Sequence, residues 1–191
     1  MVRIIAKKVT EKKEQHQEAV RLAGMLVKQS GGQEPIVYTH NSHGKPYLLA
    51  PNDHIFVNWS HSGEYVICAV SDREIGIDLQ LVKEEPKASL VRRTLQLEEL
   101  GYYESVPKGE QTKLFYQYWA VKESFLKALG TGFSAGLKEF SVQMNDGSPQ
   151  IMQNINKKKY ICRLLEFPDA DYVASICSEE KLEAAEIDYV V

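Results

Sequence analysis

Residues 54–82 read HIFVNWSHSGEYVICAVSDREIGIDLQLV, and this stretch decides the fold class. Its three runs HIFVNWS, YVICAVS and EIGIDLQLV are rich in β-branched and aromatic residues, and short turn segments separate them. Such runs predict strands. We therefore expect antiparallel strands here, with residues 71–73 as a hinge between two halves of the chain.

Both flanks add helices and further strands. Upstream, VRIIAKKV and PIVYTH predict strands, and residues 14–29 between them predict a helix because apolar residues recur there at helical spacing before Gly31 and Gly32. Downstream, residues 87–103 and 111–129 predict helices, and four apolar runs within residues 139–191 predict strands. The order does not alternate as regular βαβ units, so we expect an α+β fold with an N-terminal lobe at 1–72 and a C-terminal lobe at 73–191.

Composition narrows the function classes. The chain has 191 residues, 43% hydrophobic and 26% charged, with a net charge of -3. These values are ordinary for a globular protein and give no general attraction to nucleic acid or to an anionic membrane. No apolar run is long enough to span a membrane, and the N-terminus lacks the pattern of a signal peptide. We expect a cytoplasmic protein whose three cysteines are reduced and buried.

Two polar clusters lie in the first half. Gly44–Tyr47 (GKPY) places Lys45 beside the stiffening Pro46, which by itself is typical of a solvated turn. Asn58–Gly63 (NWSHSG) follows a strand and brings together Ser60, His61 and open backbone N–H groups. Such donors suit phosphate oxygens, although a turn capped by its own side chains fits these residues equally well.

A third cluster is Gly76–Gln80 (GIDLQ). Strand alternation points Asp78 and Gln80 to the same side. A carboxylate and an amide oxygen on one face form half of an oxygen-rich magnesium site, or simply the polar side of an amphipathic strand.

The fourth cluster, Trp119–Lys127 (WAVKESFLK), lies on a predicted helix. The spacing of four places Trp119, Glu123 and Lys127 on one face. The pair Glu123 and Lys127 fits an ordinary surface ion pair, but apolar neighbours indicate that the helix is buried and that its charges need a partner or a metal.

Taken together, in this order, the four clusters resemble the Sfp-type 4'-phosphopantetheinyl transferases, whose patterns are G-K-P, N-x-S-H-S-G, G-I-D-[IVL]-E and W-x-x-K-E-[SA]-x-x-K. The resemblance covers residues 44–140. It implies two similar lobes related by a pseudo-twofold axis, and the Mg²⁺-dependent transfer of the 4'-phosphopantetheine group from coenzyme A to a serine of an acyl or peptidyl carrier protein, with release of 3',5'-ADP. We expect the protein to be a monomer.

The resemblance implies a role for each site residue. Lys45, Pro46, Ser60, His61, Lys122 and Lys127 would bind coenzyme A, Asp78, Glu123 and Gln80 would bind the metal, and Asp78, Glu123 and Lys127 would be catalytic. Glu123 is the candidate general base for the serine, directly or through water.

The sequence departs from the family pattern at Gln80, which replaces an acidic residue, and in a short first lobe. Two alternatives stay open: a non-catalytic coenzyme A-binding module and a small phosphate-ester hydrolase. Residues 83–111, with Arg92 and Arg93, fit either a surface for an acidic carrier helix or an ordinary amphipathic helix.

Overall fold

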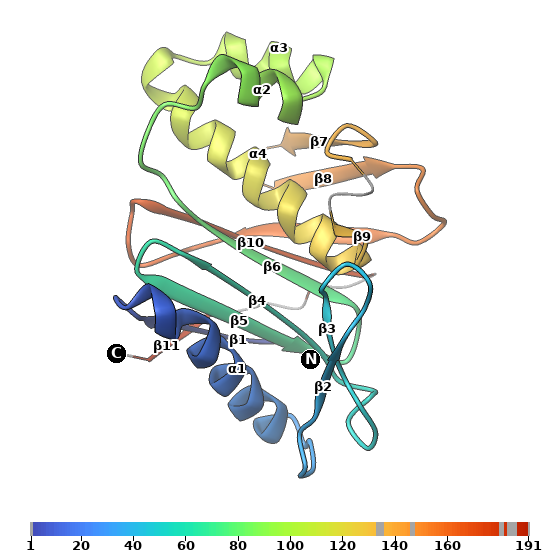
Figure 1. Cartoon of the computed structure of the whole chain (residues 1–191). Helices are drawn as coiled ribbons and strands as arrows, with labels where there is room; N and C mark the ends of the chain where they lie inside the picture. Colours follow the sequence, from blue (N-terminus) through green and yellow to red (C-terminus); the bar gives the residue numbers. More distant parts are fainter. Residues whose placement is uncertain (1, 133–135, 146–147, 180–181, 183–186, 191) are drawn as a thin grey trace.

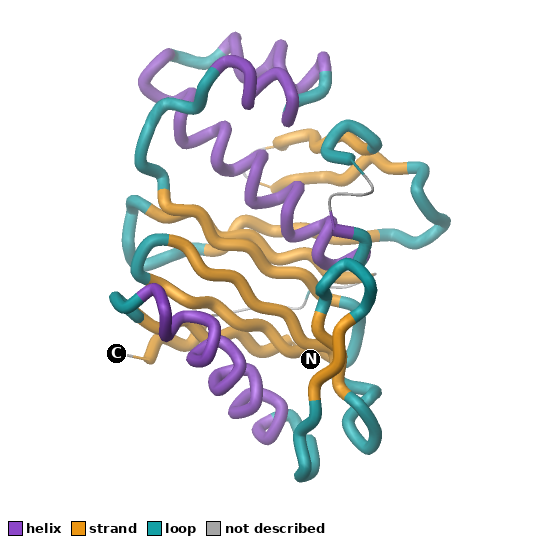
Figure 2. Tube along the Cα trace, in the orientation of Figure 1, coloured by secondary structure: helices purple, strands orange, loops and turns teal. Residues whose placement is uncertain are grey.

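The computed structural model describes residues 2–132, 136–145, 148–179, 182 and 187–190. It is an α+β fold in which strands form a layer and long helices cover it (Figure 1, Figure 2). The elements are β1 (Val2–Lys8), α1 (Lys12–Gln29), β2 (Tyr38–His40), β3 (Pro46–Leu48), β4 (Phe56–Ser62), β5 (Tyr65–Ser71), β6 (Ile75–Leu81), α2 (Ala88–Thr94), α3 (Leu97–Ser105), α4 (Lys108–Leu129), β7 (Phe140–Asn145), β8 (Ser148–Gln153), β9 (Tyr160–Leu165), β10 (Tyr172–Glu179) and β11 (Ile187–Val190).

The same arrangement of elements occurs twice along the chain. A first strand is followed by a long helix, a small hairpin and two more strands, which gives β1, α1, β2–β3, β4, β5 and then β6, α4, β7–β8, β9, β10, with α2 and α3 as an addition between β6 and α4. The sheet orders match as well, since β1-β5-β4 and β6-β10-β9 both place the last strand in the middle. The expectation of two similar α+β lobes is confirmed. Strand β11 pairs in parallel with β1, so the last described segment lies beside the first (Figure 1).

Three apolar clusters hold these elements together. α1 buries Ala19, Leu22 and Leu26 against the first sheet, as its helical spacing predicts. α4 packs Phe115 and Phe125 into a second cluster with β7, β9 and β10. The third cluster combines residues of β1 and β5 with residues of β6 and β10, and it joins the two lobes.

Some local expectations need correction. The helix expected at 87–103 is two helices, because the backbone of Leu95 and Gln96 is extended. The short strands β3 and β8 were not predicted. Cys162 and Cys177 face each other on β9 and β10 and form a disulfide, so the expectation of reduced thiols is wrong for this pair, whereas Cys68 is free and buried. None of the helices in the described residues is long and apolar enough to cross a membrane.

Candidate functional site

The candidate site lies where α4 crosses β6. Ile77 and Leu79 of β6 point into the core shared by the lobes, so Gly76 and Asp78 face α4. A Cβ atom at Gly76 would collide with the carbonyl oxygen of Ser124 and the amide nitrogen of Ala128. Glycine therefore allows the helix to approach the strand closely, and this approach brings α4 side chains to Asp78.

Asp78 is the best-connected carboxylate of the site. It is 2% exposed. Its Oδ1 accepts hydrogen bonds from Ser60 Oγ at 2.9 Å and from Lys127 Nζ at 2.7 Å, and its Oδ2 accepts one from Gln80 Nε2 at 2.7 Å. Lys127 Nζ also donates to the Ile77 carbonyl at 3.0 Å. Asp78 is thus fixed by residues from β4, β6 and α4.

Glu123 lies one helical turn before Lys127. Its Oε1 is buried and has no hydrogen-bond partner. Burial, together with the neighbouring Asp78 charge, raises the pKa of Glu123 to about 7, although Lys127 acts in the opposite direction. A buried oxygen without a partner beside a second carboxylate is an arrangement that a cation would stabilise.

The NWSHSG segment joins the lobes as well as reaching the site. β4 and β6 lie side by side but belong to different sheets (Figure 1). Asn58 Oδ1 accepts from the Ile77 N–H and Ser62 Oγ accepts from the Leu81 N–H, both at 2.9 Å. Along the boundary between β4 and β6, side-chain oxygens of β4 therefore accept the hydrogen bonds that a neighbouring strand's backbone carbonyls would otherwise accept. Ser60, the residue between them, is directed at Asp78.

His61 alternates to the other side of β4 and is exposed. Partial burial, with the charges of Lys127 and His16, lowers the pKa of His61. Its ring is open to a ligand, on the side of β4 opposite to Ser60.

Comparison with known proteins assigns the chain to a family. A family model described as "4'-phosphopantetheinyl transferase superfamily" matches residues 74–177, which is more than half of the chain and includes Asp78, Glu123 and Lys127. The chain belongs to this superfamily.

Curated relatives agree with the assignment. The chain is 38% identical to a 4'-phosphopantetheinyl transferase of Bacillus subtilis over 54% of this chain and 46% of the relative. It is 38% identical to the 4'-phosphopantetheinyl transferase Sfp of Bacillus subtilis over 61% and 51%, and 34% identical to HetI of Nostoc sp. over 76% and 62%. The chain thus spans about half the length of the first of these relatives.

Solved structures of the superfamily are more distant. The holo-(acyl-carrier-protein) synthase of Bacillus anthracis, in complex with CoA (3',5'-ADP), matches with a TM-score of 0.48 and 21% identity over 56% of this chain and 96% of that chain. The synthase of Neisseria meningitidis matches with a TM-score of 0.49 and 20% identity over 56% and 98%.

A magnesium ion, which the transferase resemblance implies, fits the residues present. No group of three His, Cys, Asp or Glu side chains able to hold a metal gathers in the described part of the chain. Asp78 Oδ2, which has one donor, and the partnerless Glu123 Oε1 supply two of the hard oxygen ligands that magnesium prefers. Gln80 presents its amide nitrogen to Asp78, so in this structure it orients a carboxylate.

Lys122 is not part of this cluster. It is fully buried and pairs with Glu99 Oε1 at 2.9 Å, and it donates to the carbonyls of Leu137 at 2.9 Å and Phe140 at 3.3 Å. Its neighbour in sequence, Glu123, faces Asp78. The structure thus places the ammonium of Lys122 inside the second lobe, and not in the Asp78 cluster where the family resemblance puts a ligand of the coenzyme A phosphates.

Lys45 and Pro46 are also buried, on the β2–β3 hairpin. Lys45 Nζ forms an ion pair with Glu74 and donates to the Ala128 carbonyl at 2.9 Å. Sequence reasoning missed Glu74 and Glu99, and no local pattern marks them as partners of lysines far away in the chain. For Glu99, the spacing Gln96-x-x-Glu99 of a capping box was a usable signal of a helix start.

Proposed function

We propose that this protein transfers the 4'-phosphopantetheine group of coenzyme A to a serine hydroxyl of a carrier protein, in a magnesium-dependent reaction. One observation carries the proposal. In a chain of this superfamily, Glu123 holds a buried carboxylate oxygen without a partner, beside the Asp78–Lys127 pair. Two carboxylates and an ammonium, contributed by two elements, are suited to a divalent cation and a pyrophosphate.

Each residue has a distinct part in the proposed reaction. The serine oxygen attacks the β-phosphate of coenzyme A, the bond to the leaving 3',5'-ADP breaks, and the serine proton must be accepted. Glu123, beside Asp78, is the proposed acceptor, and as a ligand of the metal it would take the proton through a water molecule. Lys127 stabilises the charge on the leaving phosphate, and His61 binds a phosphate of the nucleotide. A magnesium ion held by Asp78 and Glu123 would neutralise pyrophosphate charge.

The acceptor is an acyl or peptidyl carrier protein. Arg92 and Arg93 of α2 are exposed, while Val91 on the same helix is buried. An amphipathic helix with a basic outer side fits an acidic partner helix, because opposite charges steer association. We propose a monomeric, cytoplasmic enzyme that binds neither nucleic acid nor membrane.

Mass spectrometry of an apo carrier protein tests the function. The carrier is incubated with coenzyme A, magnesium and this protein. A carrier that gains the mass of one phosphopantetheine group supports transfer. Free phosphopantetheine with an unmodified carrier indicates a phosphate-ester hydrolase, and unchanged coenzyme A indicates a binding module. Glu123→Gln should abolish the gain, whereas Glu14→Gln, a matched change of an exposed glutamate on α1, should keep it.

A further inference from the structure

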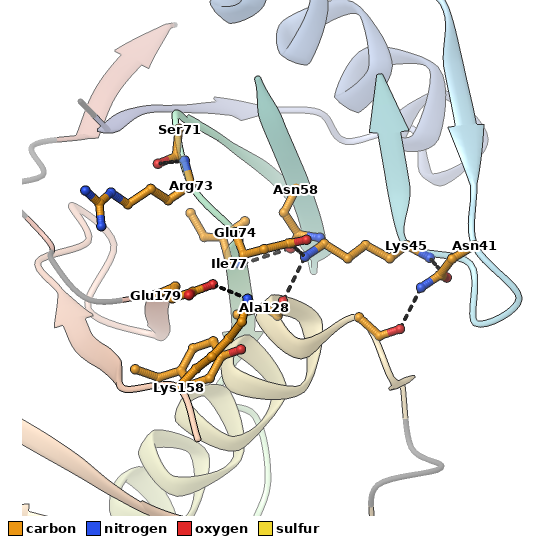
Figure 3. A network of polar contacts seen from close by, with 12 residues as sticks. Asn41, Lys45, Asn58, Ser71, Arg73, Glu74, Ile77, Ala128, Lys158 and Glu179 are labelled. Atoms are coloured by element: carbon orange, nitrogen blue, oxygen red, sulfur yellow. Dashed lines mark hydrogen bonds and ion pairs between the residues drawn. The ribbon is translucent and has the colours of Figure 1, made fainter. Parts of the chain in front are cut away.

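The tip of the β2–β3 hairpin reaches from the first lobe onto the end of α4 (Figure 3). We call residues 41–45 the α4 cap. Asn41 Nδ2 donates to the Gly130 carbonyl at 2.7 Å, and Lys45 Nζ donates to the Ala128 carbonyl at 2.9 Å. Carbonyls at a helix C-terminus lack intrahelical partners, and a cation there complements the helix dipole. The first lobe thus satisfies the end of the helix that carries the site.

The ammonium of Lys45 in this cap forms an ion pair with a residue of a third segment. Lys45 is 6% exposed, and its ammonium pairs with the carboxylate of Glu74, just before β6 (Figure 3). Burial lowers the pKa of Lys45, while Glu74 opposes this change. The Lys45 ammonium therefore already has two partners within the protein, the Glu74 carboxylate and the Ala128 carbonyl.

The contact between the cap and α4 is tight. Gly130, which follows α4, has a φ of +72°. A Cβ atom there would lie 2.9 Å from Tyr47 Oη and 3.1 Å from Lys45 Cδ. The hairpin consequently packs directly on the helix end, and a shift of one moves the other.

The cap acts on the two elements that form the site. α4 carries Glu123 and, next to the capped Ala128, Lys127, whereas β6 carries Asp78 and begins directly after Glu74. Lys45 binds both the end of α4 and the start of β6. We infer that Lys45, together with Glu74 and Asn41, is a positioning residue that sets Lys127 and Glu123 against Asp78, and is not a ligand of the coenzyme A phosphates. The kinetic part of its test rests on the proposed function.

Removing the positive charge of Lys45 and the negative charge of Glu74 in separate variants distinguishes a positioning role from phosphate binding. We compare Lys45→Met, Glu74→Gln and the double variant in kcat for carrier modification and in the calorimetric Kd of coenzyme A. For a positioning role, each single variant lowers kcat about tenfold, the double variant is no slower, and the Kd stays within about threefold. A phosphate ligand predicts opposite signs: Glu74→Gln frees the cation and tightens coenzyme A binding, while Lys45→Met weakens it. That pattern, or wild-type kcat in both variants, would overturn the inference.

The matched control is Lys158→Met. Lys158 lies in the same group of charges, but its ammonium pairs with Glu179 at 2.7 Å (Figure 3). This variant should keep the wild-type kcat, and a comparable loss would show that the kinetic effects come from the local charge balance and not from capping.

Hydrogen exchange supplies a readout that needs neither coenzyme A nor a carrier. Amides in residues 38–48 and 124–130 should exchange faster in Lys45→Met and in Glu74→Gln than in the wild type, because the opening of both segments becomes easier. Unchanged exchange would overturn the inference whatever the rates. If the wild type modifies no carrier, the proposed function fails and this measurement still decides the cap. Should Lys45→Met not fold, Glu74→Gln and Asn41→Ala provide the same comparison.

Discussion

Lys127 Nζ donates a hydrogen bond to Asp78 Oδ1 at 2.7 Å and so links the last turn of α4 to the middle of β6. The side chain of Asp78 is 3% exposed and that of Lys127 is 26% exposed, so the pair is largely shielded from water. Shielding strengthens the interaction, and Ser60 and Gln80 complete the set of donors around Asp78. Glu123, beside this satisfied carboxylate, is left with an oxygen that has no donor.

Gln80 should matter less than Asp78. Its amide donates one hydrogen bond to Asp78 Oδ2 at 2.7 Å, so we expect Gln80→Ala to lower the transfer rate by about tenfold, while Asp78→Ala abolishes transfer. Gln80→Glu should stay active and need less magnesium for half-maximal rate, because it adds negative charge near the cation. Initial rates against magnesium concentration check this. If Gln80→Ala is as inactive as Asp78→Ala, the amide is itself essential.

His61 should act in binding more than in chemistry. The ring is exposed, as a phosphate ligand requires. We expect His61→Ala to raise the Kd of coenzyme A about tenfold, the cost of one charge-assisted hydrogen bond, and to change kcat less. Calorimetry and steady-state kinetics on the same preparations separate the two effects. An unchanged Kd with a collapsed kcat would make His61 catalytic instead.

Lys122 should be a stability residue. Lys122→Met leaves the buried Glu99 carboxylate without its cation, so we expect the free energy of unfolding to fall by about 3–5 kcal/mol. Adding Glu99→Gln should recover part of this loss, because it removes the uncompensated charge. Urea unfolding measures the free energy of unfolding of both variants. The control is Lys8→Met, which breaks the exposed ion pair with Glu64 and should leave that free energy nearly unchanged. A Lys122→Met protein of wild-type stability would refute the assignment.

Glu18 should make the first lobe sensitive to acid. Hydrogen bonds from Arg21 and Lys7 lower the pKa of Glu18 to about 2, against the opposing effect of burial. A depressed pKa contributes stability above the unfolded value near 4.5, and this stability is lost as the pH falls towards 2. Glu18→Gln should thus lower the free energy of unfolding by about 1 kcal/mol at neutral pH, after allowance for the exposed partners, and by less under acid conditions. Denaturant unfolding of the wild type and of Glu18→Gln at pH 7 and pH 3 checks this prediction. A difference in the free energy of unfolding that is larger at pH 3 than at pH 7 would contradict it.

Local patterns were sufficient to predict most of the elements and to bring together part of the candidate site. Strand alternation placed Asp78 and Gln80 on one side, and helical spacing placed Glu123 and Lys127 together. The same geometry argues against Lys122, since neighbouring residues on a helix point about 100° apart. Its placement with coenzyme A came from the family resemblance and not from the helix.

The parts that were not predicted depend on contacts between distant residues. Lys45 meets Glu74 and Cys162 meets Cys177 only after the chain has folded, and nothing in the intervening sequence fixes either pair. β3 is three residues long, too short for a periodic signal. The break between α2 and α3 contains neither glycine nor proline, so composition alone did not reveal it.

We propose that Asp78 and Glu123 together form the magnesium-dependent site, and single-turnover transfer to an apo carrier at saturating coenzyme A tests this proposal. The wild type is compared with Asp78→Asn and Glu123→Gln, which preserve shape and remove charge, over a range of magnesium concentrations. We expect magnesium-dependent transfer by the wild type and none by either variant, although both remain folded. Near wild-type transfer by either variant at limiting magnesium would contradict the claim.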